Sequence, residues 1–134
     1  MTLYVDSSAL LKRYLPEADS ESAVTLLVSD PKLTTARHTS VEVRRILFKG
    51  LRGAGLAAAR EAFEEDWRSM VVIELSGRVC ERAAEIAEST GVRVLDALHL
   101  GAALEVGAGE LPILTYDARQ ARAARTLGWT VLGV

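Results

Sequence analysis

The sequence predicts a three-layer α/β/α domain built on a parallel sheet. Short apolar runs with strand character alternate with longer runs in which apolar residues recur every three or four positions. Helices that separate consecutive strands imply crossover connections, which produce parallel strand pairs. The runs at 70–73 and 111–114 are apolar throughout. That pattern is typical of strands covered by helices on both faces.

The first half of the chain is expected to begin with a strand and to end with two amphipathic helices. Its elements are expected in the order strand 2–6, helix 8–15, helix 20–29, strand 33–36, helix 39–52 and helix 56–69. Pro16 stops the first helix, because proline interrupts the helical hydrogen-bond ladder. Val43 and Leu47 share one face of the next-to-last helix. Phe63 and Trp67 do so in the last.

The second half of the chain repeats the alternation of strands and helices. Its elements are expected in the order strand 70–75, helix 77–90, helix 95–106, strand 111–115, helix 118–127 and strand 130–132. Gly91 and Gly128 follow two of these helices directly. Glycine is the usual residue after a helix end, because it adopts the left-handed conformation without steric cost.

Composition indicates one globular domain that spans residues 1–134. The chain is 49% hydrophobic and 25% charged, which excludes disorder. Cys80 is the only cysteine, so an internal disulfide and a cysteine-rich zinc site are excluded. No apolar run reaches the roughly 18 residues of a membrane span, and the first residues lack a signal peptide. We therefore expect a cytoplasmic protein. Its net charge of −2 argues against non-specific coating of nucleic acid.

Four carboxylates stand where a parallel sheet places its ligand site. Asp6 and Asp117 each follow a predicted strand, Asp96 begins a helix, and Glu42 lies one turn into another helix. Ligands of open parallel sheets bind beyond the carboxyl ends of the strands. Taken singly, each aspartate is more simply a helix cap, and Glu42 a solvated residue. Together, they form the hard oxygen set that suits Mg²⁺ or Mn²⁺ and metal-assisted phosphoryl transfer.

Hydroxyl groups beside these acids are candidates for a supporting role. Ser7, or its neighbour Ser8, could orient Asp6. Thr115 stands two residues before Asp117, so strand alternation points both side chains the same way. Ordinary turn and cap hydrogen bonds explain these hydroxyls equally well. His99 lies on a helix rich in alanine and leucine, and we interpret it as a packing residue.

Arginines are concentrated near two of the acids. Arg44 and Arg45 follow Glu42, and Arg119 follows Asp117. We predict that these three arginines guide a polyanion toward the acidic pocket, which would make them RNA-binding residues if that polyanion is RNA. A solvated helix face is an equally good explanation.

Four segments resemble the motifs of PIN domains, in particular VapC-type toxins of toxin–antitoxin pairs. They are LYVDSSALLKRY at 3–14, TSVEV at 39–43, LDALHLGA at 95–102 and LTYD at 114–117. The likeness spans nearly the whole chain, in the order typical of the family. Gly101 departs from it, because members often carry alanine there.

The resemblance implies a five-stranded parallel sheet and a metal-dependent endoribonuclease. In the family, the acids that match Asp6, Glu42, Asp96 and Asp117 coordinate Mg²⁺ or Mn²⁺, and an activated water attacks the phosphodiester. The threonine that matches Thr115 supports the site. Such toxins form homodimers and are inhibited by a cognate antitoxin protein.

Alternative interpretations fit less well. A phosphatase of the haloacid dehalogenase kind requires an aspartate at the position of Ser8. A phospho-acceptor receiver domain requires a lysine at the end of a late strand, which the last strand lacks. A catalytically silent PIN-like scaffold that binds RNA or protein remains the main alternative, although all four acids are retained.

Overall fold

The computed structural model describes residues 3–107 and 110–134. In this part of the chain, one five-stranded sheet has the order β3-β2-β1-β4-β5. The strands are β1 (Tyr4–Val5), β2 (Thr34–Ala36), β3 (Val71–Ile73), β4 (Ile113–Thr115) and β5 (Val131–Gly133). The helices are α1 (Ser7–Leu11), α2 (Ser20–Val28), α3 (Thr39–Gly50), α4 (Gly53–Ser69), α5 (Gly77–Thr90), α6 (Val94–Glu105) and α7 (Ala118–Thr126). Every strand pair is parallel, which confirms the predicted sheet.

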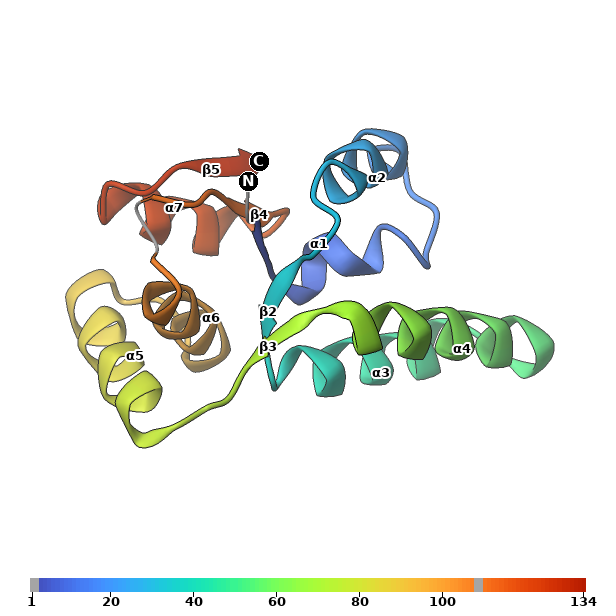
Figure 1. Cartoon of the computed structure of the whole chain (residues 1–134), viewed down its shortest axis with the longest axis horizontal. Coiled ribbons are helices and arrows are strands. Elements are labelled where there is room, and N and C mark those ends of the chain that lie inside the picture. The colour runs from blue at the N-terminus through green and yellow to red at the C-terminus, as the bar shows by residue number, and fades with distance from the viewer. Residues whose placement is uncertain (1–2, 108–109) are drawn as a thin grey trace.

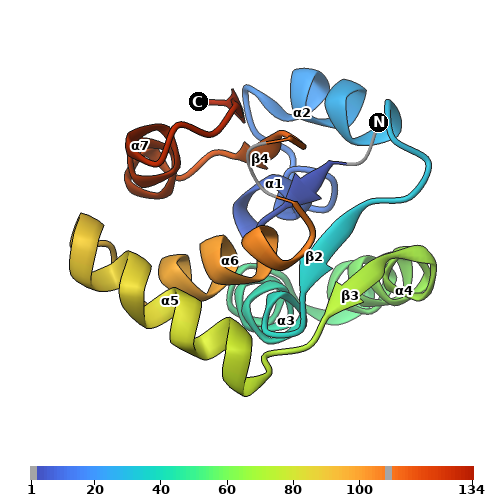
Figure 2. The same cartoon turned by 60° about the vertical axis from the view of Figure 1, so that its left-hand side comes forward.

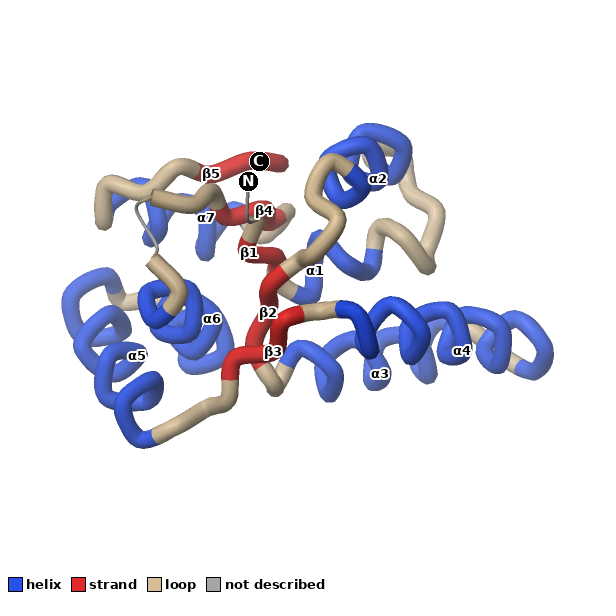
Figure 3. Tube along the Cα trace, viewed as in Figure 1, coloured by secondary structure: helices blue, strands red, loops and turns tan. Residues whose placement is uncertain are grey.

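Helices cover both faces of the sheet, as Figures 1 and 3 show. Strand alternation divides the core into two clusters. Val5 and Leu114 face one cluster with side chains of α1 to α4, whereas Tyr4 and Ile113 face the other with side chains of α5 to α7. Figure 2 shows α5 and α6 lying side by side on their face of the sheet. The three-layer prediction is therefore confirmed.

Element bounds differ from the predictions mainly at helix and strand ends. The helix predicted at 8–15 ends at Leu11, and residues 12–14 continue as turns bonded three residues back. Pro16 explains this tightening, because it disfavours helical geometry in the residue before it. The helix predicted at 56–69 begins at Gly53, so its glycine-rich start is helical. Thr2, at the start of the first predicted strand, lies outside the described residues.

The strand predicted at 70–75 is shorter and less buried than expected. β3 pairs only with β2, and their last matched pair is Ala36 with Ile73. The residues that follow Ile73 have no β2 residue with which to pair. β3 is an edge strand whose three residues are half-buried. A continuously apolar run therefore does not distinguish an edge strand from a central one.

Gly101 allows α5 and α6 to approach closely. A Cβ atom at this position would lie 2.8 Å from the carbonyl oxygen of Val79 and 3.0 Å from the backbone nitrogen of Ala83. Both atoms belong to the α5 backbone, which cannot rotate away as a side chain can. An alanine at this position would therefore require a wider spacing between the two helices.

Replacing Gly101 by alanine is expected to lower the free energy of unfolding by about 1–2 kcal/mol. Overpacking lowers the free energy of unfolding by about 1–3 kcal/mol. The higher helix propensity of alanine offsets about 1 kcal/mol of this loss at most. Urea unfolding measures the difference. Gly55→Ala is the matched control, because a Cβ there meets nothing within 4 Å; it is expected to stabilise α4. A Gly101→Ala protein as stable as the parent would contradict the close approach.

Candidate active site

Asp6 lies at the carboxyl end of β1, almost completely buried. Its side chain is 2% exposed. Oδ1 caps α1 by accepting from the backbone N–H of Ala9 at 3.0 Å, and it also accepts from the Ser8 hydroxyl at 2.7 Å. Oδ2 accepts from the Thr115 hydroxyl at 2.7 Å. Burial raises the pKa of Asp6, against the opposing effects of His99 and these hydrogen bonds.

Two hydroxyl groups connect the ends of β1 and β4. The Thr115 oxygen donates to Asp6 and accepts from the backbone N–H of Asp117 at 3.0 Å. The Ser8 oxygen also donates to Asp6 and accepts from the backbone N–H of Tyr116 at 2.9 Å. The predicted position of Thr115 beside the acids agrees with this geometry.

Of the two predicted serines, Ser8 hydrogen-bonds Asp6, whereas the candidate Ser7 does not do so among the described residues. Ser7 is the first residue of α1 and is buried. Within residues 3–107 and 110–134, no side-chain hydrogen bond joins Ser7 to Asp6. The chain turns from strand to helix at Asp6, so the Ser8 hydroxyl returns toward the cap residue as an N-terminal helical side chain does.

Asp96, Asp117 and Glu42 line one cavity of about 420 Å³. Asp96 is 9% exposed; its Oδ1 accepts from the Gln120 side chain at 3.4 Å, and its Oδ2 lies 4.0 Å from Nε of Arg93. Burial raises the pKa of Asp96, and the charge of Asp117 raises it further, while Arg93 acts in the opposite direction. Such mutual repulsion between carboxylates is what a bound cation relieves.

Asp117 also has an ordinary structural role. It is the N-cap of α7, where its Oδ1 accepts from the backbone N–H groups of Arg119 and Gln120. Asp6 caps α1 in the same way. For Asp117, capping and membership of the acidic cavity are therefore not alternatives. Asp6 does not line this cavity, and its second oxygen accepts from Thr115.

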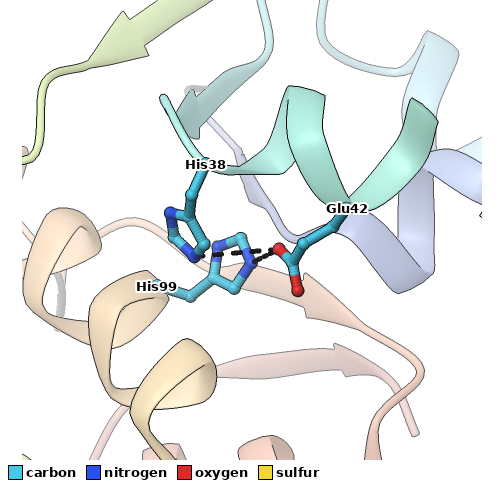
Figure 4. A group of neighbouring side chains, drawn as sticks. All are labelled: His38, Glu42 and His99. Carbon is cyan, nitrogen blue, oxygen red and sulfur yellow. Dashed lines mark hydrogen bonds and ion pairs between the residues drawn. The ribbon is translucent and has the colours of Figure 1, made fainter. Parts of the chain in front are cut away.

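Glu42 is held by a buried histidine (Figure 4). Nε2 of His99 lies 2.8 Å from Oε1 of Glu42, and Nδ1 of the same ring lies 2.9 Å from the Tyr4 hydroxyl. His99 is 1% exposed, so it is buried as expected, but its ring is a polar link and not merely a packing group. Sequence reasoning missed Tyr4 altogether, since a tyrosine in a strand gives no signal of its own.

His38 is the second group that sequence reasoning missed. It stands directly before α3, and its ring centroid lies 4.1 Å from that of His99. Its Nε2 lies 3.2 Å from the carbonyl oxygen of Leu95 and 3.7 Å from Oε1 of Glu42. Burial, and next the neighbouring His99, lower the pKa of His38 to about 4. Asp6 was identified because polar residues that follow a parallel strand lie at the ligand-binding edge of the sheet. The same rule applies to His38, which follows β2.

The donor set fits a hard divalent cation better than a softer metal such as Zn²⁺, which prefers nitrogen and sulfur ligands. His38, Glu42 and His99 have potential ligand atoms within 4.8 Å of one another. The Nε2 atoms of both histidines, however, face acceptors, the Leu95 carbonyl and the Glu42 carboxylate. A nitrogen that carries a proton toward an acceptor cannot bind a metal. The carboxylate oxygens that line the cavity are ligands that Mg²⁺ and Mn²⁺ prefer, and Nδ1 of His38 is a buried nitrogen without a hydrogen-bond partner among the described residues.

The three predicted RNA-binding arginines lie in two different places. Arg119 lines a cavity of about 430 Å³ together with Arg93 and Arg122. Arg93 also lines the acidic cavity, so the two cavities adjoin. Arg44 and Arg45 are exposed on α3 and line a separate cavity of about 330 Å³ with Phe48. Thus Arg119 is brought next to the acids, whereas no described cavity joins Arg44 or Arg45 to them.

Comparison with known proteins agrees with this geometry. A family model described as PIN domain matches residues 3–126. The chain belongs to the PIN-domain family. Ribonuclease VapC46 of Mycobacterium tuberculosis is 30% identical to this PIN domain over 131 residues, which cover 97% of this chain and 95% of the relative.

Solved structures share the PIN-domain fold at lower sequence identity. The structure of VapC20 of Mycobacterium tuberculosis, described as a Sarcin-Ricin loop cleaving toxin, superposes with a TM-score of 0.73 at 19% identity, covering 90% of this chain and 94% of that chain. A toxin–antitoxin complex from Klebsiella pneumoniae gives a TM-score of 0.68 at 16% identity, covering 90% and 89%. Both likenesses establish the fold of this PIN domain.

Proposed function

We propose that this PIN domain is an Mg²⁺- or Mn²⁺-dependent endoribonuclease, the toxin of a type II toxin–antitoxin module. One observation carries the proposal: acids from distant parts of the chain meet at the carboxyl edge of the sheet, and three of them line a single cavity. The raised pKa of the buried Asp96 beside Asp117 favours a cation as the missing neighbour. The ribonuclease name of VapC46 supports the same chemistry.

The proposed division of labour follows from the contacts of each acid. Glu42, Asp96 and Asp117 would hold the cation in the cavity, and Asp6 would supply a fixed charge beneath it. A bound divalent ion activates water and stabilises charge on the leaving oxygen of a phosphodiester. Ser8 and Thr115 orient Asp6 through its two oxygens. Arg93 balances part of the negative charge of Asp96.

We propose that the RNA strand reaches the acids from the side of Arg119. The cavity lined by Arg93, Arg119 and Arg122 adjoins the acidic cavity. Guanidinium groups bind phosphate with parallel hydrogen bonds. A local basic surface of this kind is required because the whole chain has a net charge of −2. Arg44 and Arg45 would contact more distant parts of the substrate.

An antitoxin protein and a second copy of the chain are the proposed protein partners. Phe48 and Val41 on α3 are 70% and 67% exposed and line the same cavity, so they form a shared apolar surface on this helix. Such a surface supports association with a partner. No helix in the described part of the chain has the length and apolarity of a membrane span. We propose that the nuclease acts on RNA in the cytoplasm.

Cleavage of RNA by the purified protein tests the proposed function. The protein, freed from any co-purifying partner, is incubated with total RNA in Mg²⁺, in Mn²⁺ and in EDTA. Cleavage is expected with either metal and none in EDTA, because the acids alone cannot activate water. Cleavage that persists in EDTA would contradict the metal site. No cleavage of any RNA under all conditions would favour the catalytically silent scaffold.

A further inference from the structure

His99 joins three elements that are far apart in the sequence. The ring is carried by α6 and packs edge-on against the Tyr4 ring of β1, with centroids 6.0 Å apart. One ring nitrogen meets the Tyr4 hydroxyl, and the other meets Glu42 of α3. With 1% exposure, the ring has no access to water that could replace either partner. Its orientation is therefore determined by these two contacts.

The partners of His99 also determine which atoms donate. An ionised carboxylate only accepts hydrogen bonds, so Nε2 of His99 carries the proton that faces Glu42. Nδ1 can then accept from the Tyr4 hydroxyl. A tyrosine hydroxyl can both donate and accept, so Tyr4, whose oxygen lies 2.9 Å from Nδ1, can donate that hydrogen bond.

Glu42 depends on this contact more than the other acids depend on theirs. Asp6 and Asp117 are short side chains fixed by helix N–H groups, and Asp96 receives a side-chain bond from Gln120. Glu42 is longer, stands within a helix and caps nothing. Both recorded contacts of its carboxylate, with His99 and His38, fall on Oε1. Figure 4 shows the second oxygen turned away from both rings.

We propose that His99, oriented by Tyr4, is a positioning residue that holds Oε1 of Glu42 and leaves Oε2 for the cation. The inference rests on the proposed function, since it assigns a task at the same site. Outer hydrogen bonds of this kind typically change metal affinity by about 10- to 100-fold.

Mn²⁺ affinity of matched variants tests the proposal without reference to catalysis. His99→Leu removes the donor to Glu42, and the dissociation constant for Mn²⁺, measured by electron paramagnetic resonance, is expected to rise at least about tenfold. His99→Gln retains an N–H donor and is expected to keep most of the affinity. Tyr4→Phe keeps the ring but frees Nδ1, and a smaller loss is expected. Thermal melting checks that each variant is folded.

Tyr14→Phe is the control for Tyr4→Phe, and nitrogen-15 NMR gives an independent readout. The Tyr14 hydroxyl donates to Asp66, and neither residue lines the acidic cavity, so this replacement is expected to leave Mn²⁺ affinity nearly unchanged. In the metal-free parent, the His99 ring is expected to carry its proton on Nε2. That measurement also covers the case in which His99→Leu does not fold.

The results separate this inference from the proposed function. If the parent binds Mn²⁺ and His99→Leu binds it equally well, the positioning role is overturned while the metal site stands. A His99→Gln protein as weak as His99→Leu, or a proton on Nδ1 alone, would overturn it as well. If the parent itself binds no Mn²⁺, the proposed function fails, and the positioning role with it.

Discussion

Asp6→Asn is expected to slow RNA cleavage at least about a hundredfold while the fold stays intact. The substitution removes a negative charge at the carboxyl end of β1 and changes almost no volume. Asparagine is as good a helix cap as aspartate, so its side-chain oxygen can still accept from the N–H of Ala9. The variant therefore removes the charge of residue 6 while it keeps the hydrogen bond that caps α1.

The stability of the same variant in EDTA tests the electrostatic argument. Burial raises the pKa of Asp6, so the native state binds a proton there more tightly than the unfolded chain does. An ionised Asp6 therefore lowers the free energy of unfolding at pH values above its raised pKa in the folded protein. This loss of stability disappears as the pH falls through that pKa toward the lower pKa of the unfolded chain. A neutral asparagine avoids this cost. Metal-free Asp6→Asn is expected to melt at or above the temperature of the parent.

Asp30→Asn is the matched control for this prediction. Asp30 is also a buried aspartate, and it accepts from the backbone N–H groups of Leu3 and Lys32. Asp30 precedes β2 and therefore lies at the amino edge of the parallel sheet, whereas Asp6 follows β1 and lies at the carboxyl edge. Its replacement is expected to leave the cleavage rate unchanged. An Asp6→Asn protein that unfolds would identify Asp6 as chiefly a structural cap.

Asp117→Asn is expected to reduce the cleavage rate on the order of a hundredfold and, in EDTA, to lower the pKa of Asp96. The charge of Asp117 is the second largest cause of the raised pKa of Asp96. Removing it leaves burial as the main cause, so the Asp96 pKa is expected to move toward its ordinary value. Carbon-13 NMR of the Asp96 carboxyl group during a pH titration measures the change.

Two further variants make the result specific to the site. Asp117→Ala loses the cap of α7 as well as the charge, so it is expected to be less stable than Asp117→Asn by about 1 kcal/mol. Glu85→Gln removes an exposed acid on α5 and is expected to change neither the rate nor the Asp96 pKa. An Asp96 pKa that is the same in the parent and in Asp117→Asn would contradict the coupling between the two acids.

The sequence was sufficient to predict the layers of the fold and the neighbourhood of the acids. Asp6 and Thr115 follow from one rule, because parallel strands bring their carboxyl ends to the same edge of the sheet. Ser8 was not selected over Ser7, because strand alternation no longer applies where the chain turns into α1. The direction of a side chain can be predicted from the period of its element.

The partners of His99 could not be predicted in this way. Helical periodicity places His99 on a buried face of α6, but it does not say which residues of β1 and α3 lie opposite. That depends on how closely α6 packs on the sheet and on α5, where Gly101 sets the spacing. Helix and strand bounds were missed at Pro16 and at the edge strand β3, where neighbouring geometry outweighs local propensity.

The central position of β1 has a consequence for protein synthesis. β1 lies between β2 and β4, so a chain emerging from the ribosome exposes one side of its first strand until β4 has been translated. Asp6 gains its bond to Thr115 only then. The nuclease we propose is therefore inert during most of its own translation, and a product truncated before Thr115 would be harmless to the cell that makes it.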